Sequence, residues 1–103
     1  MPVFSVSFRI HRDATYQHRY DTFVEQLTSV GVGNYWDETT SYMLVRTHET
    51  IGDFCTRIYV HSGFDSSKDV YVVMDVDAKS ARARGKIEYP NTLKSLVPYI
   101  VPL

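Results

Sequence analysis

A carboxylate and two imidazoles lie close together near the start of the chain. His11 and Asp13 occupy alternate positions of one segment, and His18 follows about one helical turn later. Histidine and carboxylate side chains can bind Zn²⁺ or exchange protons, and Asp13 with its copy in a second chain could hold Mg²⁺. Asp13 could equally cap a following helix by accepting a hydrogen bond from its first turn. Asp13 is therefore the candidate catalytic residue, with helix capping as the simpler alternative.

Six cations form a second candidate site. They are Lys79, Arg82, Arg84 and Lys86, which fall within eight residues, and Arg9 and Arg12 near the N-terminus. Cations on a flexible segment next to an aromatic side chain such as Tyr89 can follow a phosphate backbone. The six are therefore the predicted nucleic-acid-binding residues, for RNA or DNA. A solvated linker is the alternative interpretation of the segment.

Two aspartates and the single cysteine are three further polar or reactive side chains of the sequence. Asp75 and Asp77 share one face at the end of an apolar segment. One of them is expected to form an ion pair with Arg9 on a neighbouring strand. Cys55 lies on the apolar stripe of a helical segment, so we expect a small buried side chain without chemistry.

Length and composition limit the class of protein. The chain has 103 residues, 44% of them hydrophobic, with a net charge of −1. This size predicts one domain, with a core at residues 2–78 and a C-terminal extension at 79–103. The balanced charge provides no overall attraction to nucleic acid, so such binding needs a local patch. A single cysteine excludes an internal disulfide, and no stretch resembles a signal peptide or a membrane span, so a cytoplasmic protein without membrane contact is expected.

The elements that must position these residues follow from apolar periodicity. The pattern changes from period 2 to period 3.6 and back, twice. It predicts strands at residues 3–10, 34–38, 41–47 and 70–76. It also predicts a helix from Asp13 to Gly31 or Gly33, and a second helix capped by Thr47 that ends at Ser62 or Gly63. This order is typical of an α+β, ferredoxin-like βαββαβ sandwich, a four-stranded antiparallel sheet with two helices on one face.

The C-terminal extension is too apolar to remain in water. From Pro90 onward it contains seven large apolar residues: Leu93, Leu96, Val97, Tyr99, Ile100, Val101 and Leu103. It could pack on its own sheet as a strand or short helix, or cross to a second copy of the chain. Pro98 and Pro102 favour an edge position for any strand there.

Three local features support a family resemblance. They are the strand and polar loop at residues 8–13, the helix motif of Tyr16, Tyr20, Phe23 and Leu27, and the hairpin at residues 36–45. Together they resemble the ferredoxin-like superfamily that includes the second core CRISPR-associated protein and virulence-associated protein D, especially its short bacterial members. The resemblance covers residues 3–77.

The resemblance implies a homodimer formed through the sheets and, in some members, a metal-dependent endoribonuclease. Those nucleases place an aspartate after the aromatic or other apolar residue that ends the first strand. Here Arg9 follows Phe8 at that position, and a guanidinium repels Mg²⁺. Ser41 matches the serine that begins the third strand of the family.

These observations predict a non-enzymatic homodimeric binding or scaffold module, without metal or cofactor, that could contact RNA or DNA. The alternative is a toxin-like, Mg²⁺-dependent endoribonuclease in which Asp13 replaces the lost aspartate. A small-ligand or regulatory domain is a third, weaker possibility.

Overall fold

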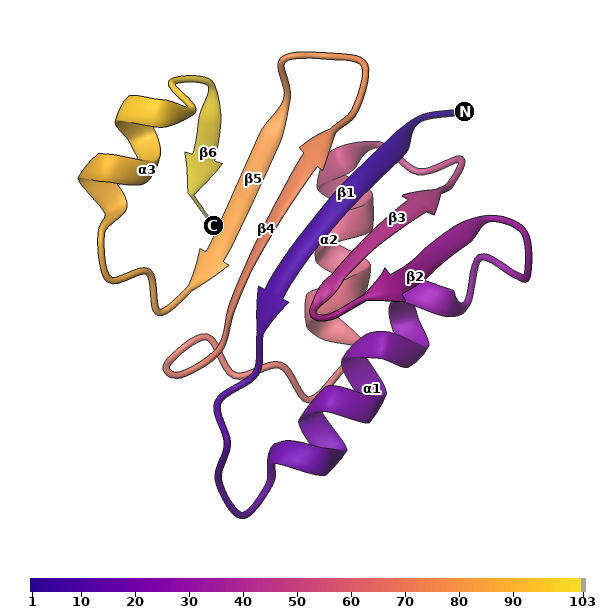
Figure 1. Ribbon diagram of the computed structural model, residues 1–103, viewed down its shortest axis with the longest axis vertical. Helices are drawn as coiled ribbons and strands as arrows, with labels where there is room; N and C mark the ends of the chain where they lie inside the picture. The colour runs from indigo at the N-terminus through magenta and orange to yellow at the C-terminus, as the bar shows by residue number, and fades with distance from the viewer. Residues whose placement is uncertain (103) are drawn as a thin grey trace.

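The chain alternates strands and helices as its periodicity predicts, and the first six elements have βαββαβ order. A computed structural model describes residues 1–102 and shows an α+β protein with three helices and a six-stranded mixed sheet (Figure 1). The elements are β1 (Val3–Arg9), α1 (Tyr16–Thr28), β2 (Tyr35–Thr39), β3 (Tyr42–Arg46), α2 (Ile51–Val60), β4 (Val70–Asp75), β5 (Ala81–Gly85), α3 (Pro90–Leu96) and β6 (Ile100–Pro102).

The strands lie in the order β2-β3-β1-β4-β5-β6. All neighbouring pairs are antiparallel except β5 and β6, which are parallel. The four-stranded antiparallel sheet predicted from the sequence is therefore extended by two strands at the β4 edge. Strands β1 and β5 run in the same direction, so both end at the lower edge of the sheet in Figure 1.

One face of the sheet packs against both α1 and α2. The alternating residues Phe4, Val6 and Phe8 of β1 are buried on this face. The Phe4 ring lies 5.1 Å from the ring of Phe54 on α2, and the Phe8 ring lies 5.1 Å from that of Phe23 on α1. Burying these apolar side chains is the main force that holds the helices on the sheet.

Within residues 1–102, the opposite face is covered only at the β6 end. Ala81 and Ala83 of β5 and Ile100 of β6 form a second apolar cluster there, which contacts Leu93 of α3 and Val97 just after it. The C-terminal extension thus packs on its own sheet, one of the two arrangements that the sequence left open. Helix α3 lies away from β1, β3 and β2, whose second face it leaves uncovered (Figure 1).

Both predicted helix caps are wrong, although both helices are present. Thr15 occupies the N-cap of α1, while Asp13 accepts a hydrogen bond from the Thr15 amide. Thr50 caps α2 by accepting from the Asp53 amide, and the buried Thr47 donates to Glu49 instead. The observed N-caps therefore lie two and three residues after the predicted ones.

A glycine turn fixes the chain where β5 ends. Gly85 has φ of 113°, and a Cβ there would lie 1.9 Å from the carbonyl oxygen of Asp69. Only glycine tolerates both this backbone conformation and this close approach. The Lys86 amide then donates to the Asp69 carbonyl at 2.9 Å, which ties the end of β5 to the segment before β4.

Within residues 1–102, no helix is both long enough and apolar enough to cross a membrane.

Candidate functional site

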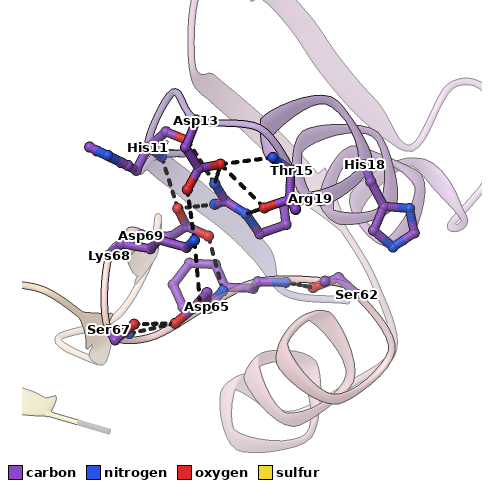
Figure 2. A network of polar contacts seen from close by, with 12 residues as sticks. His11, Asp13, Thr15, His18, Arg19, Ser62, Asp65, Ser67, Lys68 and Asp69 are labelled. Atoms are coloured by element: carbon purple, nitrogen blue, oxygen red, sulfur yellow. Dashed lines mark hydrogen bonds and ion pairs between the residues drawn. The ribbon is translucent and has the colours of Figure 1, made fainter.

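Asp13 lies in the loop between β1 and α1, where it takes part in a network of ion pairs (Figure 2). Its Oδ1 accepts hydrogen bonds from Arg19 at 2.6 Å and from the Thr15 amide at 3.0 Å. Its Oδ2 accepts from the Lys68 ammonium at 2.7 Å. Both carboxylate oxygens are thus bound to cations of the protein itself.

Asp69 is the buried centre of this network. Its side chain is fully buried and accepts three hydrogen bonds, from Arg19, from the His11 amide at 2.8 Å and from the Asp65 amide at 2.9 Å. Arg19 is also buried and donates to the His11 carbonyl at 2.8 Å. A buried ion pair is favourable only when further hydrogen bonds satisfy its remaining groups. Here those bonds join α1, the segment after β1 and the segment before β4.

The network changes the electrostatics of its members. The hydrogen bonds from Lys68 and Arg19 hold the pKa of Asp13 far below its ordinary value of 3.8. The hydrogen bond to Asp69 raises the pKa of Arg19 above its ordinary value. Asp13 is therefore ionised at neutral pH and is already paired with two cations. A general base or Mg²⁺ ligand needs lone pairs that are free to accept a proton or a metal ion.

The two histidines near Asp13 do not join it in a common site. His11 takes part in the network through its backbone groups, and the His18 side chain points away from Asp13 in Figure 2. Among residues 1–102, no group of three or more His, Cys, Asp or Glu side chains is arranged to hold a metal ion.

The six predicted nucleic-acid-binding cations are distributed over different faces and edges. Arg82 and Arg84 are paired in register with Val73 and Tyr71, so they lie on the face that carries α1 and α2. The Arg84 guanidinium stacks 3.8 Å over the ring of Tyr59 on α2. These two arginines therefore do not lie on the second face of the sheet.

The other four cations are also separated. Lys79 lies in the turn between β4 and β5, at the upper edge of the sheet in Figure 1. Arg12 lies 4.7 Å over the ring of Tyr16 at the start of α1. Of the six, only Arg9 and Lys86 line a common groove. Arg9 is the last residue of β1 and Lys86 directly follows β5, and together with Tyr89 they line one shallow groove of about 320 Å³.

The predicted ion pair between Arg9 and an aspartate at the end of β4 is wrong. Arg9 is paired in register with Val70 at the start of β4, whereas Asp75 lies opposite Phe4 at the other end. The antiparallel direction of β4 places its carboxyl end beside the beginning of β1, so the Arg9 side chain has no aspartate of that strand as its neighbour.

Cys55 is buried, as predicted. Desolvation raises the pKa of its thiol to about 11, and burial likewise raises the pKa of the neighbouring Tyr71 to about 12. A thiol with so high a pKa is almost entirely protonated at neutral pH and is a poor nucleophile.

The sheet's second face carries a row of partly exposed apolar side chains. The part that α3 leaves uncovered is called the open face here and consists of Val3, Ser5, Trp36, Tyr42, Leu44 and Met74. Trp36, Leu44, Ser5 and Met74 lie side by side across four strands. Trp36 is 39% exposed. A shallow hollow of about 440 Å³ lies on the Met74 side of this row, and one of about 190 Å³ lies beside Trp36.

Opposite charges flank the open face at its upper edge. Arg46 of β3 lines the smaller hollow, and Asp77, which follows β4, lines the larger one. Strand β1 lies between β3 and β4. Within residues 1–102, neither the Arg46 nor the Asp77 side chain forms an ion pair.

Arg19 and Asp69, the buried members of the network, belong to no motif of the sequence. They are separated by 50 residues, and no short-range spacing connects them. The sequence holds one weak signal. Arg19 lies three residues after Tyr16 and four before Phe23, on the apolar stripe of the helix, and Asp69 directly precedes the apolar strand.

Comparisons of the chain with protein-family models, with curated proteins and with solved structures each found no match.

Proposed function

We propose that this chain is a non-enzymatic binding or scaffold module that works as a homodimer joined through the open face. The observation that carries the proposal is the row of Trp36, Leu44 and Met74. Trp36 and Leu44 lie outside the cluster beneath α3, and Met74 packs at the border of that cluster. The order β2-β3-β1-β4 with α1 and α2 on one face supports a ferredoxin-like assignment for the core. A sheet face of this kind buries its apolar side chains when a second copy packs on it.

The charges beside the row favour a second copy as the occupant. In an isologous dimer the same surface meets itself, so complementary charges must lie on opposite sides of the twofold axis. Arg46 and Asp77 lie on opposite sides of β1. A twofold axis along β1 therefore brings Arg46 of each copy toward Asp77 of the other.

The ion pairs of Asp13 argue against the alternative of a metal-dependent endoribonuclease. That activity would require Asp13 to leave Lys68 and Arg19 and to bind Mg²⁺ instead. Both cations would then repel the metal ion at short range. Arg9, at the end of β1, adds a third positive charge in the position where the resembled nucleases keep an aspartate.

Light scattering coupled to size-exclusion chromatography tests the dimer. The wild-type chain of 11.9 kDa should elute with twice that mass. Leu44→Glu should give the mass of one chain, because it places a carboxylate in the apolar row of each copy. The matched control Glu25→Gln, an exposed change on α1, should leave the dimer intact.

Charge exchange tests the orientation. Arg46→Glu alone and Asp77→Lys alone should each weaken the dimer, because each puts like charges opposite one another. The double variant with both substitutions should regain the wild-type mass at low protein concentration. If the double variant is weaker than either single variant, the proposed twofold axis is wrong.

An RNA cleavage assay tests the absence of enzymatic activity. Purified protein with single-stranded RNA and Mg²⁺ or Mn²⁺ should leave the RNA intact. Cleavage by the wild type that disappears in Asp13→Ala, while Asp37→Ala retains it, would establish the endoribonuclease instead.

A further inference from the structure

A groove at the lower edge of the sheet combines two cations with an exposed aromatic ring. It lies between the end of β1 and the segment that joins β5 to α3, and its volume is about 320 Å³. The residues that line it include Arg9, Val70, Lys86, Glu88, Tyr89 and Leu93. The groove lies at the opposite end of β1 from Arg46 and Asp77, about 20 Å away for a strand of seven residues.

The two cations are free to bind a ligand. Arg9 and Lys86 are both exposed, and within residues 1–102 no carboxylate forms an ion pair with either of them. Glu88 lines the same groove without pairing to them. The backbone of both residues is held in place, since Arg9 ends a central strand and the Lys86 amide is bound to the Asp69 carbonyl.

Tyr89 supplies a stacking surface. Its side chain is 73% exposed, although a ring of this size is ordinarily buried at least in part. The residue precedes Pro90, and its carbonyl accepts the first hydrogen bond of α3, so the backbone at this position is held in place. A free aromatic face beside unpaired cations matches a nucleobase attached to its phosphates.

We propose that this groove binds single-stranded nucleic acid, with one base stacked on Tyr89 and the adjacent phosphates bound by Arg9 and Lys86. The inference rests on the binding role proposed above and names its ligand, but it does not require the dimer. A single strand is favoured over a duplex because the bases of a duplex are already stacked and cannot reach Tyr89. Arg82 and Arg84 do not take part, because they lie on the other face of the sheet.

Fluorescence anisotropy with labelled ten-nucleotide oligo-dT and oligo-U measures the binding. We expect a Kd of roughly 10–100 µM at low salt for at least one of the two oligonucleotides, and weaker binding of a duplex of the same length. The two single strands distinguish DNA from RNA. No binding of either strand at 1 mM protein, or tighter binding of the duplex, would overturn the proposal.

Variants identify the groove as the binding site. Tyr89→Ala should weaken binding roughly 5- to 100-fold, whereas Tyr89→Phe should retain it because the ring is kept. Lys86→Gln should lower the slope of log K against log salt by about 0.7, the contribution of one phosphate contact on a single strand. Lys79→Gln removes the same charge at the other end of the sheet and should not change this slope.

Two further variants distinguish binding in the groove from the effects of dimerisation and of overall charge. Glu88→Gln should tighten binding, because it removes the one carboxylate in the groove. Leu44→Glu, which should dissociate the dimer, should leave the affinity per chain within about twofold. If Lys79→Gln and Lys86→Gln weaken binding equally, the interaction is nonspecific and the groove is not the site. Circular dichroism checks that each variant is folded.

Discussion

The substitution Asp69→Asn tests the buried network without changing the size of the side chain. Asp69 accepts from Arg19 and the His11 amide through Oδ1 and from the Asp65 amide through Oδ2. An asparagine has one acceptor oxygen, so its NH₂ group must face one of these donors. The buried Arg19 guanidinium would also lose its fully buried counter-charge.

The expected loss of stability follows from these two effects. Removing one partner of a buried ion pair lowers the free energy of unfolding by about 3–5 kcal/mol. This range already includes the cost of leaving one buried amide N–H without an acceptor. Stability of a domain of this size is ordinarily about 5–15 kcal/mol, so a large share is lost. At an m-value of about 1.5 kcal/mol/M, the midpoint of urea unfolding should fall by roughly 2–3 M.

Urea unfolding followed by tryptophan fluorescence and circular dichroism measures the effect. The matched control is Asp37→Asn, which makes the same chemical change on the exposed strand β2 and should alter stability by less than about 0.5 kcal/mol. If the two variants unfold at the same urea concentration, Asp69 does not hold the network together, and the account of the site is wrong.

Three further predictions concern acid stability, the thiol and the glycine turn. The pKa of Asp13 is lower in the folded chain than in the unfolded chain, so its contribution is present above about pH 4 and is lost as the pH falls through the folded-state value. Thermal unfolding from pH 6 to pH 2 should show a smaller loss of Tm in Lys68→Gln than in the wild type, and an identical loss would contradict the ion pair. Cys55 should not react with a thiol reagent at pH 8 until denaturant is added, because its pKa is about 11 and it is buried; rapid reaction of the native chain would argue against the packing of α2. Gly85→Ala should destabilise the chain by more than about 1 kcal/mol, although glycine-to-alanine changes at unstrained positions stabilise proteins by about 0.4–1 kcal/mol, because its Cβ would meet the Asp69 carbonyl at a positive φ; a neutral effect in calorimetry would mean that the turn differs.

The alternation of polar and apolar residues predicted most of the fold. The first four strands and two helices lie within a few residues of their expected bounds, because all of them except the exposed β2 bury one periodic apolar face. The extension was harder to predict. Residues 81–85 contain two arginines and two alanines, which have little preference for a strand, and they become β5 only because β4 offers an edge and α3 covers the alanines.

The candidate site could be predicted only in part. Asp13 was singled out as a candidate catalytic residue or helix cap in a loop, and it does lie in the loop between β1 and α1. Its partners Arg19 and Lys68 could not be predicted, because tertiary structure brings them to it. The six cations appeared as one cluster because four are close in the sequence. Alternation along β5 sends Arg82 and Arg84 to one face, and the length of the strand separates Lys79 from Lys86.

We propose that a second copy of the chain covers the open face. Isotope-filtered NMR on a mixture of labelled and unlabelled chains tests it most directly, because it detects only contacts between copies. The account predicts intermolecular NOEs to the methyl groups of Leu44 and Met74 and none to the buried Leu27 of α1. If the labelled and unlabelled wild-type chains have been mixed and equilibrated and no intermolecular NOE appears at Leu44 or Met74, a second copy does not cover the open face.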